Sequence, residues 1–169
     1  MSKQPTRIFG SAHISQCGQY RYELTRSWDA TKPTIAFVML NPSTADAAED
    51  DPTIRKCIKF ANRWGFGELR VYNLFNLRTP NPEQLWSHED PNGPDFGKWA
   101  SKAKECDKIV VAWGASGKKG VLAAKGRCFV GEHLNDVELW ALAINSDGTP
   151  RHPLYVRDDQ DLTRWEAWR

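Results

Sequence analysis

Polar side chains accompany two apolar segments of the chain and could form one ligand-binding site. Residues 35–40 read IAFVML and lead into an Asn-Pro-Ser-Thr sequence, and residues 69–77 read LRVYNLFNL, with an asparagine inside the segment. If both segments are parallel strands, their carboxyl ends lie at the same edge of a sheet, which is where open parallel sheets bind ligands. The polar residues that we expect at this edge are Asn41, Ser43, Thr44, Asp46 and Asn73.

Asn73 is the strongest of these candidates because it interrupts an apolar segment. A buried amide costs free energy unless its oxygen and nitrogen find partners, so binding of a ligand would explain it. The loop at residues 41–44 has a simpler alternative, because Asn, Ser and Thr side chains also satisfy free backbone amides in turns and at helix starts. Both interpretations of that loop stay open.

A site of this kind requires a parallel sheet, and the order of apolar segments favours one. Strands are expected at residues 35–40, 69–77, 108–113 and 137–143, with helical segments between them. Continuous apolar strands are typical of a sheet that is covered on both faces. The alternation therefore indicates an α/β protein with three α/β/α layers and a central, mainly parallel sheet.

A helix is expected to begin near Pro52, between the first two of these strands. Asp51 is a good N-cap, and proline suits the first helical position. The helix presents an apolar face of Ile54, Cys57, Ile58, Ala61 and Trp64 and ends at Gly65 and Gly67. A basic stripe consists of Arg55, Lys59 and Arg63. The stripe is either a solvated face or an extension of a phosphate-binding surface.

The two ends of the chain are expected to add a hairpin and a short helix. Residues 19–28 alternate in polarity after a Cys-Gly-Gln turn, which predicts an N-terminal β-hairpin within residues 1–33. Residues 34–169 would then form the core of a single domain. Short helices are expected at residues 83–87, at 99–106, within 121–134 and in the tail, 162–169.

Composition and charge narrow the class of protein. A net charge of +2 permits an anionic partner without requiring one. No apolar run approaches the roughly 18 residues of a membrane span, and residues 1–10 lack the apolar stretch of a secretory signal. The four cysteines are scattered without a CxxC pair, which argues against a metal site and suits reduced thiols. We therefore expect a cytoplasmic protein without a bound metal.

The chain resembles a bacterial family of proteins of unknown function, numbered 1643. The resemblance rests on LNPSTAD at residues 40–46, DDPT at 50–53, WGFG at 64–67 and NLF at 73–75. It covers most of the chain from about residue 35.

Short segments also resemble motifs of uracil-DNA glycosylases, in the same order along the chain. MLNPST at residues 39–44 resembles the first motif, and VYNLFNLR at 71–78 resembles the strand whose asparagine recognises a pyrimidine; that asparagine falls on Asn73. VVAWGASGKKG at 110–120 resembles a strand and turn of the same branch. RHPLYV at 151–156 resembles the loop that supplies a catalytic histidine. The histidine falls on His152, but leucine and tyrosine follow His-Pro where those enzymes have serine.

This resemblance implies a glycosylase-like fold and a DNA base-excising hydrolase, which needs no cofactor and extrudes a damaged or modified base into its pocket. Asn73 would read the edge of the base, and His152 would donate to it as negative charge develops. Asn41 would orient the attacking water, with Asp46 as a substitute base. The loop residues beside the base would be Pro42, Ser43 and Thr44. The contacts to the DNA backbone would come from Ser116, Lys118, Lys119 and Arg151.

Other functions remain open on the same residues. One is a non-catalytic module that binds nucleic acid or reads a modified base, and another is a hydrolase of free nucleosides or nucleotides. Fold alone does not distinguish these, because one architecture supports many functions. Residues 114–120 lack the GxxxxGK[ST] spacing of a nucleotide-binding P-loop, so that class of phosphate site is not expected.

Overall fold

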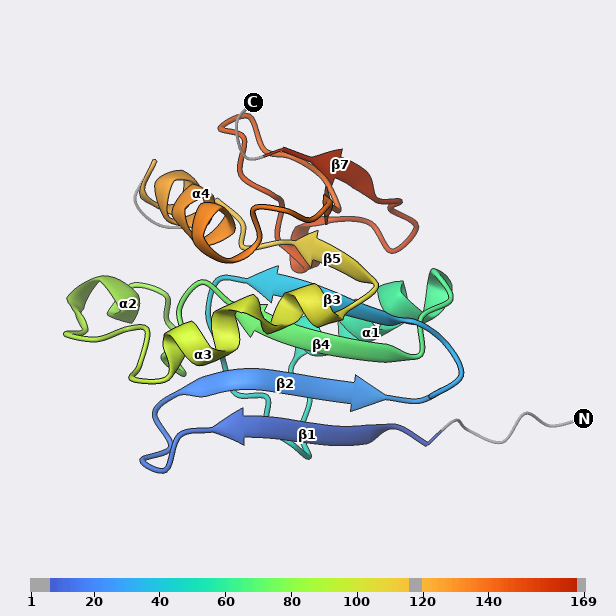
Figure 1. Ribbon diagram of the computed structural model, residues 1–169, viewed down its shortest axis with the longest axis horizontal. Helices are drawn as coiled ribbons and strands as arrows, with labels where there is room; N and C mark the ends of the chain where they lie inside the picture. The colour runs from blue at the N-terminus through green and yellow to red at the C-terminus, as the bar shows by residue number, and fades with distance from the viewer. Residues whose placement is uncertain (1–6, 116–119, 167–169) are drawn as a thin grey trace, which may run out of the picture.

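The computed structural model describes residues 7–115 and 120–166 of the chain. In these ranges the strands form one sheet in the order β1-β2-β4-β3-β5-β6-β7 (Figure 1). The strands are β1 (Phe9–Ile14), β2 (Arg21–Ser27), β3 (Thr34–Met39), β4 (Glu68–Asn73), β5 (Lys108–Val111), β6 (Leu139–Ala141) and β7 (Thr163–Trp165).

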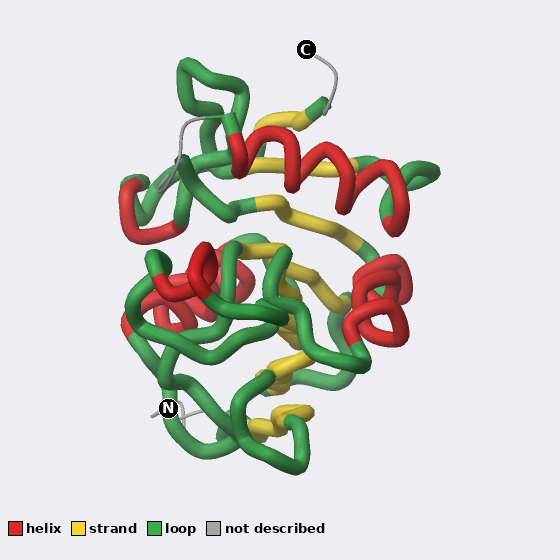
Figure 2. The backbone as a smooth tube through the Cα atoms, turned by 90° about the vertical axis from the view of Figure 1, so that its left-hand side faces the viewer, coloured by secondary structure: helices red, strands yellow, loops and turns green. Residues whose placement is uncertain are grey.

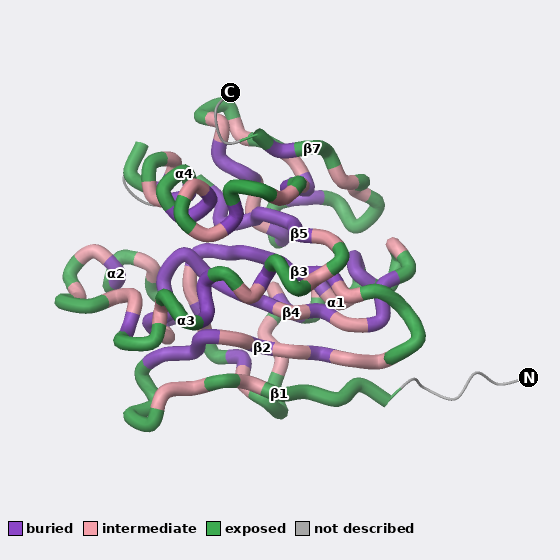
Figure 3. The backbone as a smooth tube through the Cα atoms, viewed as in Figure 1, coloured by how far each residue is buried: buried purple, intermediate pink, exposed green. Residues whose placement is uncertain are grey.

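The central strands are parallel, as the apolar segments predict. β3 pairs in parallel with β4 on one side and β5 on the other, and β6 pairs in parallel with β5. β3 is buried from Ile35 to Met39 because it lies in the middle of the sheet (Figure 3). The strands end earlier than predicted, at Asn73 in β4 and at Val111 in β5. The α/β class and the parallel order of the four predicted segments are confirmed.

Antiparallel strands flank this parallel core. β1 and β2 form the predicted hairpin, and β2 joins the sheet through an antiparallel pairing with β4. At the opposite edge, β7 pairs antiparallel with β6. The predicted helix in the tail is therefore wrong at residues 163–165. Pairing with the open edge of β6, together with burial of Trp165, outweighs the helical spacing of the apolar residues in the tail.

Helices cover both faces of the sheet (Figure 2). On one face lies α1 (Pro52–Arg63), and on the other lie α3 (Phe96–Ala100), the 3-10 helix η1 (Ser101–Glu105) and α4 (Val121–His133). The remaining helices are α2 (Gln84–Ser87) and the 3-10 turn η2 (Pro153–Tyr155), which contacts α1. No helix within the described ranges is long and apolar enough to cross a membrane.

α1 begins where the sequence predicts. The Asp51 carboxylate accepts a hydrogen bond from the Ile54 N–H at 2.8 Å, and Pro52 is the first helical residue. The buried face consists of Ile54, Cys57, Phe60 and Ala61, and the basic stripe is exposed at Arg55, Lys59 and Arg63.

The connections that leave β3 and β5 turn to opposite faces of the sheet. β3 leads through residues 40–51 to α1, whereas β5 leads to α4 on the other face. Neighbouring parallel strands whose connections separate in this way leave a crevice at their carboxyl ends, and α/β proteins bind ligands in such crevices.

Trp113 follows β5 and forms one side of this crevice. Its ring meets the ring of Trp165 edge to face, with centroids 5.3 Å apart. α4 approaches the same ring through Gly126, where a Cβ would lie 2.2 Å from Trp113. The position of Trp113 therefore depends on the absence of a side chain at Gly126.

Two glycine substitutions in α4 test this packing. Gly126→Ala should lower the free energy of unfolding by about 1–3 kcal/mol, because the added methyl must displace Trp113. Gly131→Ala is the matched control, since nothing lies within 4 Å of its Cβ. It should raise the free energy of unfolding by about 0.4–1 kcal/mol by restricting the unfolded chain. Urea unfolding measures both values, and equal effects would contradict the close approach of α4 to Trp113.

Candidate functional site

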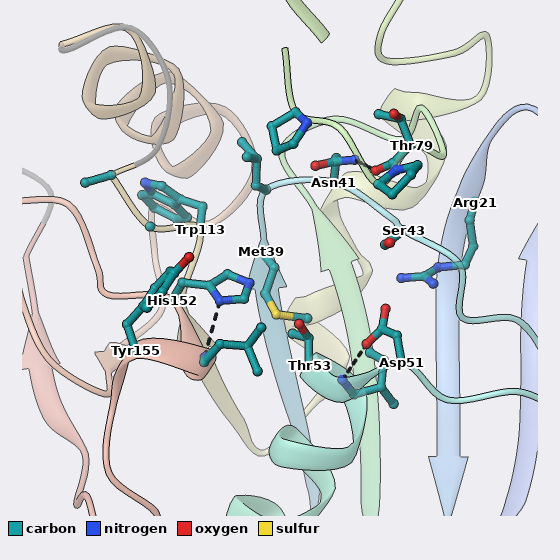
Figure 4. Close-up of a pocket in the computed structure, with 17 residues that line it drawn as sticks. Arg21, Met39, Asn41, Ser43, Asp51, Thr53, Thr79, Trp113, His152 and Tyr155 are labelled. Carbon is teal, nitrogen blue, oxygen red and sulfur yellow. Dashed lines mark hydrogen bonds between the residues drawn. The ribbon is translucent and has the colours of Figure 1, made fainter. Parts of the chain in front are cut away.

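A cavity of about 380 Å³ opens at the carboxyl ends of β3 and β5 (Figure 4). Met39, Leu40 and Asn41 line it at the end of β3, and Trp113 and Gly114 line it after β5. Further lining residues come from β2, from the loop after β3, from residues 79–82, from the start of α1 and from residues 152–155. The cavity thus lies in the crevice that the separating connections create.

Asn41 lies on the cavity wall with its amide nitrogen turned toward the protein. Nδ2 donates to the carbonyl oxygens of Pro42 and Thr79, at 2.9 Å each, and to that of Leu77 at 3.4 Å. The amide oxygen points away from these carbonyls (Figure 4). It is therefore available as an acceptor for a water or a ligand in the cavity.

His152 faces the same cavity as a neutral imidazole. Burial, opposed only in part by the charge of Asp51, lowers the pKa of His152 from 6.5 to about 4. Nδ1 accepts a hydrogen bond from the Leu154 N–H at 3.3 Å, so the ring proton at neutral pH lies on Nε2. Nε2 points toward the middle of the cavity (Figure 4). His152 is therefore an uncharged hydrogen-bond donor to whatever the cavity holds.

The loop after β5 packs closely against His152 because Gly114 has no side chain. A Cβ at Gly114 would lie 3.2 Å from the His152 Cβ, and its φ of +82° favours glycine. Two aromatic rings stand nearby: Trp113 is buried in the wall, and Tyr155 is 76% exposed at the rim. The exposed ring of Tyr155 offers a flat surface that suits a planar ligand such as a nucleobase.

The other end of the cavity holds charged and polar groups from β2 and from the start of α1. The Arg21 guanidinium points toward Ser43 and Asp51 (Figure 4). Its Nη1 donates to the carbonyl oxygen of Ala45 at 2.7 Å, and its Nε has no partner in the described part of the chain. Burial lowers the pKa of Arg21 to about 10, so the side chain stays charged at neutral pH.

Sequence reasoning missed Arg21 and the cavity-facing position of Asp51. Alternation groups Arg21 with Glu23 and Thr25, as if on the polar side of a hairpin. In the structure β2 is an inner strand, between β1 and β4, and Arg21 is only 2% exposed. Nothing in the local pattern reveals this burial, because it follows from the place of β2 in the sheet. Asp51 is the predicted N-cap and lines the cavity as well.

Asn73 does not line the cavity. Its side chain is buried, and neither its amide oxygen nor its amide nitrogen has a partner among the residues that the structure describes. It pairs in register with Met39, which does line the cavity, so Asn73 lies one strand away from the wall.

Other predicted site residues divide in the same way. Ser43 lines the cavity, whereas Asp46 is part of a turn in which its carboxylate accepts hydrogen bonds from the N–H groups of Ala48 and Glu49, which lowers its pKa. Like Asn73, four further predicted site residues do not line the cavity: Pro42, Thr44, Asp46 and Arg151. Ser116, Lys118 and Lys119 lie outside the described residues. Within the described residues, no group of three or more His, Cys, Asp or Glu side chains is placed to hold a metal ion.

A protein-family model, described as a protein of unknown function (DUF1643), matches residues 21–154. No curated protein and no solved structure matches the chain. The matched range contains Arg21, Asn41, Trp113 and His152, so the main features of the cavity lie within the part of the chain that the family shares.

The titration of His152 tests the environment of its ring. The NMR signal of its Cε1–H should stay constant from about pH 7.5 to about pH 5 and move only near pH 4, because burial disfavours the charged imidazole. Between pH 6.5 and about 4 the unfolded chain binds this proton more readily than the folded chain. The contribution of His152 to stability is therefore complete above pH 6.5 and is lost as the pH falls through that interval. A midpoint near 6.5 would show that the ring is solvated; the variant His152→Gln identifies the signal.

Asn41→Asp tests the structural role of the amide. A carboxylate cannot donate to the three carbonyl groups that Nδ2 contacts, so the substitution should lower the free energy of unfolding by about 1–3 kcal/mol at neutral pH. Asn135→Asp, at an exposed position, should change it by about 0.5 kcal/mol or less. Urea unfolding of both variants provides the comparison, and equal stabilities would show that the amide does not hold the loop.

Proposed function

The chain belongs to the DUF1643 family, and we propose that it hydrolyses the N-glycosidic bond of a nucleobase held in the cavity between β3 and β5. One observation carries the proposal: Asn41 and His152, far apart in sequence, line the same cavity. Both lie in the segments that resemble motifs of uracil-DNA glycosylases. A damaged or modified base in DNA is the first candidate substrate, since such a base must leave the helical stack and enter a pocket.

His152 would stabilise the departing base. When the bond between base and sugar breaks, its electron pair stays with the base, and negative charge develops on the oxygen or nitrogen atoms of the ring. The Nε2–H of a neutral imidazole donates to such an atom, and this hydrogen bond strengthens as the charge grows. Because the pKa of His152 is about 4, the ring stays in this form throughout the neutral range.

The other wall would position the attacking water. The amide oxygen of Asn41 points away from the carbonyls that Nδ2 contacts (Figure 4) and would accept a hydrogen bond from a water beside the sugar. The water oxygen forms the new bond to the anomeric carbon, and its proton needs an acceptor. Asp51 lines the cavity and is the better candidate for this base than Asp46, whose carboxylate is engaged in a turn.

A module that binds a base without cleaving it is the second candidate. Two observations favour it. Asn73, to which the resemblance assigns base recognition, does not line the cavity. The glycosylases have serine after His-Pro, whereas this chain has Leu154 and Tyr155. The exposed ring of Tyr155 could stack on a base without taking part in its cleavage.

A substrate panel distinguishes the two candidates. Oligonucleotides that carry different modified bases are incubated with the protein and treated with alkali, which cleaves the strand where a base has been lost. Free nucleosides and nucleotides are tested in parallel by chromatography of the released base. Release from any substrate supports hydrolysis, whereas binding without release supports the module that only reads the base.

His152→Ala tests the chemical role on any accepted substrate. The single-turnover rate should fall by about 10²–10³, which is the usual effect of removing one donor to a developing charge. His88→Ala removes a histidine outside the cavity and should leave the rate unchanged. Melting curves establish that both variants are folded. A folded His152→Ala variant with the parent rate would remove His152 from the mechanism.

A further inference from the structure

We infer that the end of the cavity beside Arg21 binds a phosphate group, with Arg21, Ser43 and the first turn of α1 as its binding site. The inference rests on the proposed function for the base and the sugar, and it identifies the substrate as a nucleotide that presents its phosphate to Arg21.

Arg21 is a buried cation without an ion pair among the described residues. Arg21 is 2% exposed, and among the described residues one of its five N–H groups donates to a protein acceptor, the carbonyl oxygen of Ala45. The Nε is buried without a partner. A buried charge is costly unless it is paired and hydrogen-bonded. The guanidinium is aimed into the cavity (Figure 4), where an anionic ligand would complete its hydrogen bonds.

The second buried arginine of β2 shows what a purely structural arginine looks like in this fold. Arg26 is 3% exposed and pairs with Asp50 at 2.8 Å. It also donates to the carbonyl oxygens of Thr25, Asp46 and Glu49. Among the described residues Arg21 makes one hydrogen bond to the loop by comparison, so holding the loop accounts for only part of its donor capacity.

The first turn of α1 supplies further donors at the same place. α1 has 12 residues, and the N-terminus of a helix attracts anions through its free N–H groups and its dipole. Pro52 has no N–H, and the N–H groups of Ile54 and Arg55 donate to the carboxylate and the carbonyl oxygen of Asp51. The N–H of Thr53 is left without an acceptor among the described residues. Thr53 and Ser43 both line the cavity and bring hydroxyl groups to it.

The arrangement of these donors favours phosphate over a carboxylate. Arg21, Ser43 and Thr53 line the cavity from β2, from the loop after β3 and from α1. Their guanidinium and two hydroxyls suit a tetrahedral group with several oxygens. Asp51 shares this end of the cavity, but one of its oxygens accepts from the helix N-terminus. Its other oxygen remains the proposed acceptor for the proton of the attacking water.

Arg21 and His152 lie at opposite sides of the cavity (Figure 4). A phosphate at Arg21 and a base at His152 therefore place one nucleotide across it. The phosphate belongs either to a free nucleoside monophosphate or to a nucleotide within a strand, and both present the same group to Arg21.

Phosphate binding is measured on the full chain by thermal unfolding. Inorganic phosphate is titrated at constant ionic strength, with sodium acetate as the reference anion. Phosphate should raise the melting temperature progressively, because a ligand that binds only the folded state stabilises it, and acetate should have no such effect. If neither inorganic phosphate nor nucleoside monophosphates change the melting curve relative to acetate, the inference is wrong.

Two arginine substitutions locate the site. Arg21→Gln should weaken phosphate binding about tenfold to a hundredfold, which corresponds to the loss of a charge-assisted hydrogen bond. Arg70→Gln removes an arginine of β4 that pairs with Glu68 and does not line the cavity, and it should leave the affinity for phosphate unchanged. Equal losses of affinity in the two variants would overturn the assignment. Where Arg21→Gln does not fold, Ser43→Ala decides: weaker phosphate binding supports the site, and unchanged binding overturns it.

Competition identifies the source of the phosphate and separates this inference from the proposed function. Displacement of phosphate by nucleoside monophosphates but not by oligonucleotides indicates a free nucleotide, and displacement by oligonucleotides indicates a strand; either supports the site. Base release is measured in the same samples. Phosphate binding without base release contradicts the hydrolase and leaves the phosphate site in place. Base release from unphosphorylated nucleosides at the same rate as from the corresponding nucleotides supports the hydrolase and overturns the phosphate site.

Discussion

Two buried arginines of β2 hold the loop on which the whole cavity depends. Residues 40–51 contain neither helix nor strand, so their carbonyl groups need donors from elsewhere in the chain. Arg26 donates to two of them, those of Asp46 and Glu49, and forms an ion pair with Asp50; Arg21 donates to that of Ala45. The loop carries Asn41 and ends at Asp51. Because both arginines belong to β2, the N-terminal hairpin helps to shape the candidate site in addition to extending the sheet.

The elements of the parallel core could be predicted because their signals are local. β3 and β5 are continuous apolar runs, and α1 has an N-cap, a proline and a regular apolar spacing. The tail could not be predicted. The spacing of its apolar residues is a local signal that favours a helix, whereas β7 forms because it pairs with β6, which is distant in the sequence. The early end of β4 has a similar cause, since its ladder with β3 stops where β3 stops, at Met39.

The candidate site was predictable to the extent that it follows from strand ends. Asn41 directly follows β3, and His152 lies in a loop that the glycosylase resemblance singles out; both line the cavity. Asn73 is one strand away because its side chain belongs to the sheet interior and not to the crevice. The position of Arg21 in the site could not be predicted, because Arg21 is buried only through the placement of β2 between β1 and β4. Alternating polarity gives the two sides of a strand but not what covers each side.

The residues that line the cavity come from distant parts of the sequence, which affects how cooperatively the protein opens and unfolds. Arg21 is the first residue of β2, and His152 lies between β6 and η2, near the other end of the described chain. A ligand that touched both would tie together the first and last thirds of the sequence across the sheet. Its binding would slow amide hydrogen exchange in the edge strands as well as in the loops that it contacts, because local opening of either end would first have to release the ligand.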